Sequence, residues 1–215
     1  MPVLMEIETY RLEELSESAK TNARNWYRDT SLDHGWHDFT FDDFERICEI
    51  LGVSLKTDIV RLRGGAKRSQ PRIYFSGFWN QGDGACFEGF YSYAKGAHRR
   101  IRDHAPLDTE LHSIADALRT VQSRNFYQLS AGVSHHGRYC HEHSMTISVE
   151  RDGPFQDVAD TEEAIAEVLR NLACWLYRRL SAEYEYLSSD EAVDESIIAN
   201  GFRFSASGER FLRIA

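Results

Sequence analysis

The segment that most constrains the fold is residues 161–187, where apolar side chains recur at the spacing of one helix face. A helix with such a stripe has to bury it against another layer of the protein. The stripe consists of Ile165, Val168, Leu169, Leu172, Trp175, Leu176 and Leu180. The rest of the chain must therefore supply a matching apolar layer.

Two pairs of β-rich runs predict that layer. The first pair, 72–79 and 85–93, flanks the turn sequence NQGDG, and the second, 126–133 and 141–149, flanks SHHGRY. Helical spacing also marks residues 12–28, 41–51, 108–122 and 190–200. We therefore predict an α+β fold: a mostly antiparallel sheet built from hairpins, helices packed on one face of it, and acidic C-terminal helices.

The length of 215 residues suits one domain of ordinary size. We predict a single α+β domain over 1–215, with a sheet-containing core in 1–154 and an acidic helical portion in 155–215. No apolar run approaches the roughly 20 residues that span a bilayer, and the N-terminus lacks the basic start of a signal peptide. The four cysteines form no CxxC pair, so we expect reduced thiols in a cytoplasmic protein.

The net charge of −9 is concentrated toward the C-terminus, because residues 155–200 hold eleven acids against three arginines. An acidic surface suits a basic partner, whereas a solvated helix face is the alternative interpretation. The predicted partner-binding residues are Glu183, Glu185, Asp190, Glu191, Asp194 and Glu195. The negative total disfavours direct binding to nucleic acid, although Arg61, Arg63, Lys67, Arg68 and Arg72 form a local basic run.

Residues 75–89 (FSGFWNQGDGACFEG) hold four glycines, three phenylalanines and a tryptophan. Asp83, between Gly82 and Gly84, is predicted at a loop tip, where it could act as an acid, a base or a cation ligand. A purely structural turn is the alternative. Ser76 and Cys86 lie beside this loop but outside any nucleophile motif, so we predict no catalytic residue.

Residues 134–143 (SHHGRYCHEH) hold four of the nine histidines. His141 and His143 lie two apart on a predicted strand and would face one side, while Cys140 would face the other. A metal site would need a further ligand from elsewhere, such as Asp83 or Glu88. Because no complete ligand set is visible, we predict no metal and no cofactor.

Three blocks of sequence resemble a known family: IYFSGFWNQGDGACFEGFYSYAKGA, DTELHSIADALRTVQSRNFYQLSA and GRYCHEHSM. This family is carried by phages, prophages and conjugative elements, and its members are often labelled as antitoxins of a toxin–antitoxin stability system. The resemblance covers residues 6–150 and, more loosely, the acidic helices. It implies a mobile-element protein and assigns no chemistry to any residue.

We therefore expect a regulatory or inhibitor protein rather than an enzyme. It would bind a host or mobile-element protein, such as a nucleic-acid-binding one, in an antitoxin-like or counter-defence role (anti-CRISPR or anti-restriction, for example). The alternative is a small enzyme or a metal- or ligand-binding protein in which Asp83, Glu88, His141 and His143 converge in one pocket. Pairing of exposed sheet edges would also allow a homodimer.

Overall fold

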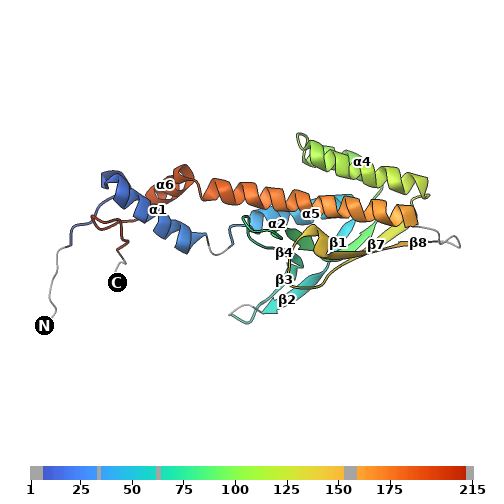
Figure 1. The fold of residues 1–215 in the computed structure, drawn as a ribbon, viewed down its shortest axis with the longest axis horizontal. Helices are drawn as coiled ribbons and strands as arrows, with labels where there is room; N and C mark the ends of the chain where they lie inside the picture. Colours follow the sequence, from blue (N-terminus) through green and yellow to red (C-terminus); the bar gives the residue numbers. More distant parts are fainter. Residues whose placement is uncertain (1–6, 33–34, 62–63, 153–158, 212–215) are drawn as a thin grey trace. The chain divides into compact units, whose positions relative to one another are not determined.

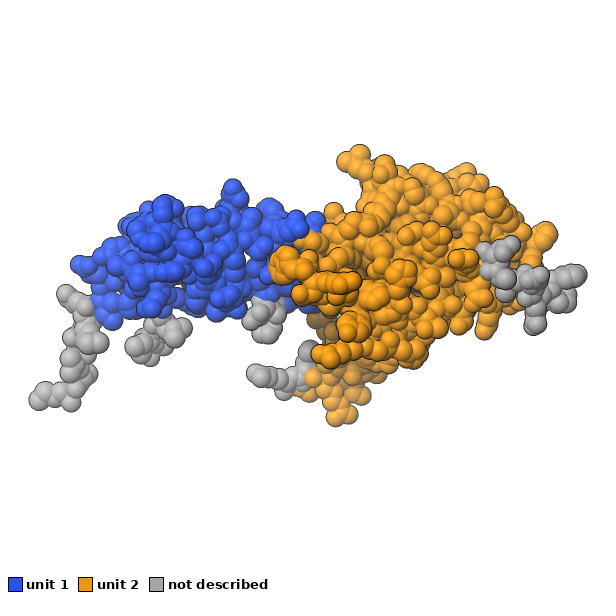
Figure 2. Space-filling model, viewed as in Figure 1, with its two compact units in different colours: residues 1–38, 182–215 blue, residues 39–181 orange. Residues whose placement is uncertain are grey.

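The computed structural model describes residues 7–32, 35–61, 64–152 and 159–211 (Figure 1). The chain forms two compact units (Figure 2). The first combines Met1–Asp38 with Ala182–Ala215, and the second is Phe39–Ser181. The division expected at residue 154 does not coincide with this grouping, because the C-terminal helices are shared between the two units.

The first unit is helical. It contains the short 3-10 helix η1 (Leu12–Glu14), α1 (Glu17–Ser31) and α6 (Asp190–Ala199). Ser16 caps α1 and Ser189 caps α6, each through a side-chain oxygen that accepts a hydrogen bond from a backbone N–H of the first turn. Apolar side chains from both chain ends form its core: Leu12, Leu15, Ala19, Ala23, Val193, Ile197 and Phe204.

The second unit is built around a four-stranded antiparallel sheet with the order β1-β6-β7-β8. Its strands are β1 (Val53–Leu55), β6 (Gly89–Ser92), β7 (Leu129–His135) and β8 (Met145–Arg151). On β8, Met145, Ile147 and Val149 are buried while the residues between them are exposed. One face of the sheet is therefore covered and the other meets solvent.

Two smaller antiparallel pairs complete the β structure. The pair β2 (Thr57–Arg61) and β3 (Lys67–Pro71) is exposed along almost its whole length. The pair β4 (Ile73–Phe75) and β5 (Ala85–Phe87) is the hairpin predicted around NQGDG. A second short 3-10 helix, η2 (Glu142–Ser144), precedes β8.

The helices α2 (Asp38–Leu51), α3 (Ala97–His104), α4 (Thr109–Arg124) and most of α5 (Ala159–Leu187) belong to the second unit. The ring of Phe44 on α2 packs edge-on against Phe87 of β5 and stacks on Trp175 of α5. The long helix thus buries the stripe that its sequence predicted. The α+β class with hairpin-built antiparallel sheets is confirmed.

Some local expectations were wrong. Residues 12–28 do not form one helix, because Ser16 is extended and starts α1 as its cap. Residues 141–144 are not strand, since His141 caps η2 and β8 begins only at Met145. The helix α3 was not predicted, because Ile101 is its only buried residue and no apolar stripe marks it. No helix among the described residues has both the length and the apolar character to cross a bilayer.

Candidate functional site

The glycine-rich hairpin and the histidine-rich connection meet in the second unit. A Cβ atom built on Gly84 would lie 2.5 Å from His141 Cβ and 3.1 Å from the carbonyl oxygen of Cys140. Ser76 holds the same contact, because its Oγ accepts from Gly84 N (3.3 Å) and donates to Cys140 O (3.4 Å). Only glycine allows the two backbones to approach this closely. The two motifs therefore belong to one site.

Asp83 organises the hairpin loop itself. Its Oδ2 accepts hydrogen bonds from the backbone N–H groups of Trp79 (3.0 Å) and Asn80 (2.7 Å). Both donors precede Asp83 in the chain, so its carboxylate closes the loop by satisfying local backbone N–H groups. The carboxylate group is thus engaged with its own loop.

Glu88 occupies a different environment. Its side chain is buried, and its carboxylate accepts hydrogen bonds from Arg72 Nη1 (3.3 Å), Lys56 Nζ (3.4 Å) and Tyr74 Oη (3.5 Å). Two cations and a phenol therefore compensate for the removal of this charge from water. Glu88 closes an ion-pair network between the hairpins, which occupies its acceptor capacity.

His141 and His143 lie together at the start of η2. The ring of His141 accepts a hydrogen bond at Nδ1 from the backbone N–H of His143 (3.1 Å), and the two ring centroids are 6.0 Å apart. The side chain of His143 is 70% exposed and lies 3.7 Å from Glu142. These contacts give His141 a capping role.

A third group of side chains at this junction combines three chain segments. Cys86 of β5, His135 at the end of β7 and Cys140 of the following loop place their ligand atoms within 4.8 Å of one another. Cys86 is fully buried, and the other two are half-buried. His135 Nε2 donates to the carbonyl oxygen of Tyr139 (2.9 Å), because a carbonyl can only accept. In the neutral ring this leaves a lone pair on Nδ1.

The same surroundings decide against nucleophilic chemistry. Burial raises the pKa of Cys86 to about 12, so the free side chain is a thiol at neutral pH. Burial also raises the pKa of Cys174 to about 11. The hydroxyl group of Ser76 is used in holding Gly84 and Cys140, and no histidine within the described ranges forms a hydrogen bond with it. Neither thiol is therefore activated as a thiolate by its surroundings, and the Ser76 hydroxyl is engaged with backbone groups.

The acidic residues predicted as a binding surface lie in the first unit and fall into two classes. Asp194 forms a two-pronged hydrogen bond with Arg24 (2.7 and 2.6 Å), and Asp190 bridges Arg28 Nη2 (2.5 Å) and Arg24 Nη1 (3.1 Å). These pairs tie α6 to α1. The Arg28 hydrogen bond, followed by the charge of Arg24, lowers the pKa of Asp190. Asp190 and Asp194 therefore serve the fold of the unit.

The remaining acids include side chains without such partners. Glu191 and Glu195 are exposed, lie one turn apart on α6, and form no ion pair or side-chain hydrogen bond with any residue that the structure describes. Glu183 is half-buried on α5 and is likewise unpaired within those residues. The two like charges of Glu191 and Glu195, four residues apart on one helix, repel each other. Glu185 also lies on α5 and is exposed.

The charge of the chain separates with its two units. The sequence of the first unit holds fifteen acidic and seven basic residues, which gives −8, whereas the second holds nineteen and eighteen, which gives −1. Almost the entire net charge thus belongs to the smaller unit. A short sequence window showed the acidic C-terminal run, but only the fold shows that the N-terminal acids join it.

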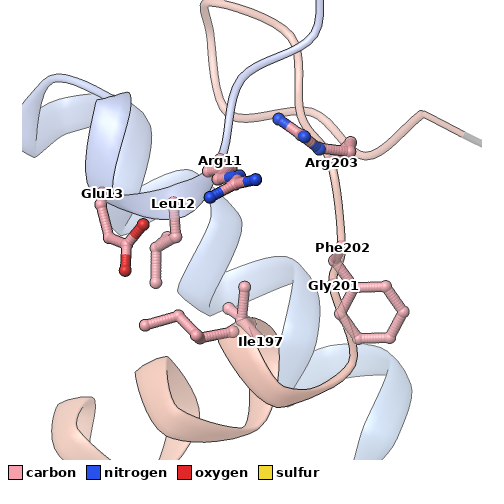
Figure 3. Close-up of a pocket in the computed structure, with 8 residues that line it drawn as sticks. Arg11, Leu12, Glu13, Ile197, Gly201, Phe202 and Arg203 are labelled. Carbon is pink, nitrogen blue, oxygen red and sulfur yellow. The ribbon is translucent and has the colours of Figure 1, made fainter.

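The first unit also has a pocket of about 320 Å³ between η1, the end of α6 and the segment that follows α6. Figure 3 shows Leu12, Ile197 and Phe202 as apolar lining and Arg11 and Arg203 as charged lining. Sequence reasoning missed this pocket, because its lining residues come from opposite ends of the chain and carry no motif.

The members of the basic run differ in whether they are paired. Arg72 is paired with Asp58 (2.8 Å) and with Glu88, which leaves it unavailable to an anionic partner. Arg61, Lys67 and Arg68 lie on the exposed β2–β3 hairpin, while Arg63 lies outside the described residues.

Comparison with known proteins gives one result. The family described as DUF8835, a domain of unknown function, matches residues 36–190, and the chain belongs to this family. The match covers the whole of the second unit and all of α5. No curated protein and no solved structure matches the chain.

Proposed function

We propose that this DUF8835 protein is a non-enzymatic regulator or inhibitor that binds a basic host or mobile-element protein through the acidic first unit. The observation that carries the proposal is the separation of charge, since the first unit holds −8 of the net −9. A field of one sign steers a partner of the opposite sign and raises the association rate.

The pairing pattern within the first unit supports a narrower choice of partner-contacting residues. Asp190 and Asp194 are held by Arg24 and Arg28, so their charges are partly neutralised. Glu191 and Glu195 are like charges one turn apart, and no cation among the described residues pairs with either of them. A basic partner would relieve their repulsion. We therefore assign the recognition role to Glu183, Glu191 and Glu195, with Glu185 beside them.

The biological setting follows from the sequence resemblance to phage- and plasmid-borne proteins labelled as antitoxins. An acidic protein of this origin could occupy the basic, nucleic-acid-binding surface of a toxin or an immune nuclease. Such competition suits a counter-defence protein, as in anti-CRISPR or anti-restriction inhibition. Four free thiols are consistent with action in a reducing cytoplasm.

The test compares two charge-reversal variants in a phage plating assay on hosts that carry CRISPR or restriction immunity. Glu191→Lys with Glu195→Lys reverses the proposed contact. Glu163→Lys with Glu167→Lys is the matched control, because these acids are also exposed and one turn apart, but on α5 in the second unit. We expect wild type and control to raise plating equally and the first variant to lose the effect.

Affinity capture with the same three proteins tests whether the protein binds a toxin, as an antitoxin would. A partner that wild type and control retain, and that the α6 variant releases, supports the proposal. Equal behaviour of all three proteins in both assays contradicts it.

A further inference from the structure

We propose that Cys86, His135 and Cys140 form a zinc-binding site that joins the β4–β5 hairpin to the β7–β8 connection. This inference is independent of partner binding, because all three residues lie in the second unit. The site differs from the set considered from the sequence: Asp83, Glu88, His141 and His143 are each engaged elsewhere, whereas the three proposed ligands converge.

The distances suit a tetrahedral ion. With Zn–S bonds of about 2.3 Å and Zn–N bonds of about 2.0 Å, neighbouring ligand atoms of a tetrahedron lie roughly 3.5–3.8 Å apart. The three ligand atoms already lie within 4.8 Å of one another. Bringing them to bonding positions requires shifts of about 1 Å or less in side chains, two of which are half-buried and border solvent.

The chemistry of the ligand set selects the metal class. Two cysteine sulfurs and one imidazole nitrogen form a borderline-soft set that favours Zn²⁺ over the oxygen-seeking Mg²⁺ and Ca²⁺. When both thiols give up their protons and bind Zn²⁺, the charges of the two thiolates and the ion cancel. The half-buried site then carries no net charge, which removes the cost of leaving a thiolate there alone. A water molecule takes the fourth position of a site with three protein ligands.

Neighbouring groups hold the ligands in position. The hydrogen bond from His135 Nε2 to Tyr139 O fixes the tautomer in which Nδ1 keeps the lone pair that a metal requires, and metal-binding histidines usually donate from their other nitrogen in this way. Tyr74 is the direct cross-strand partner of Cys86, and its ring lies 5.3 Å from that of His135. Directly opposite cross-strand residues have their side chains on the same face of the ladder. Cys86 therefore lies on the same face as Tyr74, the face that His135 covers.

A metal at this site would also stabilise the short β4–β5 ladder. The β4–β5 ladder has only three residues on each strand, and a two-stranded ladder of this size is marginally stable by itself. A metal bound to Cys86, His135 and Cys140 would link this ladder to the main sheet. Gly84 permits the close contact that brings Cys140 to Cys86.

The experiment uses the full chain, stripped of metal with a chelator and kept reduced with a phosphine. Zn²⁺ is titrated against a chromophoric chelator, and Co²⁺ serves as a spectroscopic probe. We expect one zinc per chain and, with cobalt, a thiolate charge-transfer band together with tetrahedral d–d bands. Zinc should also shield the half-buried thiol of Cys140 from alkylation, whereas the half-buried Cys174, outside the cluster, should react equally with and without zinc, as identified by mass spectrometry.

The variants Cys86→Ser, Cys140→Ser and His135→Gln should each weaken zinc binding by more than about 100-fold, since loss of a mere outer-shell partner already costs about 10–100-fold. Matched controls are Cys174→Ser, a half-buried cysteine outside the cluster, and His143→Gln, an exposed histidine in the same connection. The controls should keep wild-type affinity. Circular dichroism shows whether each variant is folded, and His135→Gln, at a half-buried position, provides a ligand change that leaves the fully buried thiol intact.

Three outcomes overturn the inference. The first is binding of less than one zinc per chain by folded wild type. The second is zinc affinity that the cysteine and His135 variants share with the controls. The third is a Cys86–Cys140 disulfide that persists in the phosphine buffer, which would make the two thiols a redox pair instead.

Discussion

Gly84 and His141 are packed so closely that a methyl group on residue 84 would lie 2.8 Å from His141 Cα. This contact brings together two motifs that are more than fifty positions apart in the sequence. It explains why a glycine follows Asp83 in the loop, and it places the cysteine-bearing connection against the cysteine-bearing hairpin.

Gly84→Ala should destabilise the second unit by about 1–3 kcal/mol, the usual effect of overpacking a tight contact. Its new Cβ would meet backbone, which cannot yield as a flexible side chain can. Urea unfolding measures the loss. Gly132→Ala is the control, because a Cβ there meets no atom within 4 Å. Equal stability of the two variants would show that the contact is loose.

Asp83→Ala should lower stability by about 1 kcal/mol, comparable to the loss of a helix cap, because it removes the acceptor for two backbone N–H groups. Asp83→Asn should retain most of the turn, since an amide oxygen can still accept. Thermal unfolding of the three proteins tests this order. A large loss in Asp83→Asn, equal to that in Asp83→Ala, would mean that the negative charge is required.

Gln122→Leu should destabilise the fold by about 1–3 kcal/mol, the cost of leaving buried backbone groups without partners. The buried side chain of Gln122 donates to Leu129 O (2.8 Å) and accepts from Leu129 N (3.3 Å), and it also donates to Tyr91 Oη (3.2 Å). It thus pairs with the first residue of β7 as a neighbouring strand would. Chemical denaturation should show the loss, and Ser123→Ala on the exposed side of α4 should show almost none.

The interaction of Asp190 with Arg28 and Arg24 predicts a pH dependence for the first unit. Because folding lowers the pKa of Asp190, the stabilisation is present above its unfolded value, near 3.9, and is lost as the pH falls through the folded value. The side chain of Asp190 is 59% exposed, so we expect no more than about 1 kcal/mol at pH 7.

Melting curves of wild type and Asp190→Asn between pH 7 and pH 2 test that prediction. The difference in Tm should be largest at pH 7 and vanish at the acid end. Glu191→Gln removes a like-charge repulsion instead of an ion pair, so it should not lower the Tm at any pH. A constant difference for Asp190→Asn across this range would mean that packing rather than charge accounts for it.

Local signals predicted much of the fold. Ser189, before an acidic first turn, marked the start of α6. Gly52 ends α2 with a φ of +90°, a conformation that glycine adopts easily because it has no Cβ atom. The apolar stripe of α5 and the two hairpins could be predicted because hydrophobic periodicity and turn residues are properties of short stretches of sequence. The helix α3 lacked such a stripe and was therefore missed.

The site could not be predicted in the same way. Cys86 and Cys140 stood in the sequence as separate candidates, and His135 as one histidine among four. Their convergence depends on the pairing of β4 with β5 and on the close approach at Gly84, which no local pattern encodes. The pairing of Arg24 with Asp194, 170 residues apart, likewise decides which acids remain unpaired.

The most direct test of the central claim is the affinity of the captured partner, reconstituted with the purified full-length protein, at increasing salt. Electrostatic recognition through α6 predicts that affinity falls as salt rises. It also predicts that Glu191→Lys with Glu195→Lys binds about tenfold or more weakly, a change of roughly 1.4 kcal/mol. The Glu163→Lys with Glu167→Lys control should bind as wild type does. An affinity that is insensitive to salt and equal in all three proteins would contradict the account.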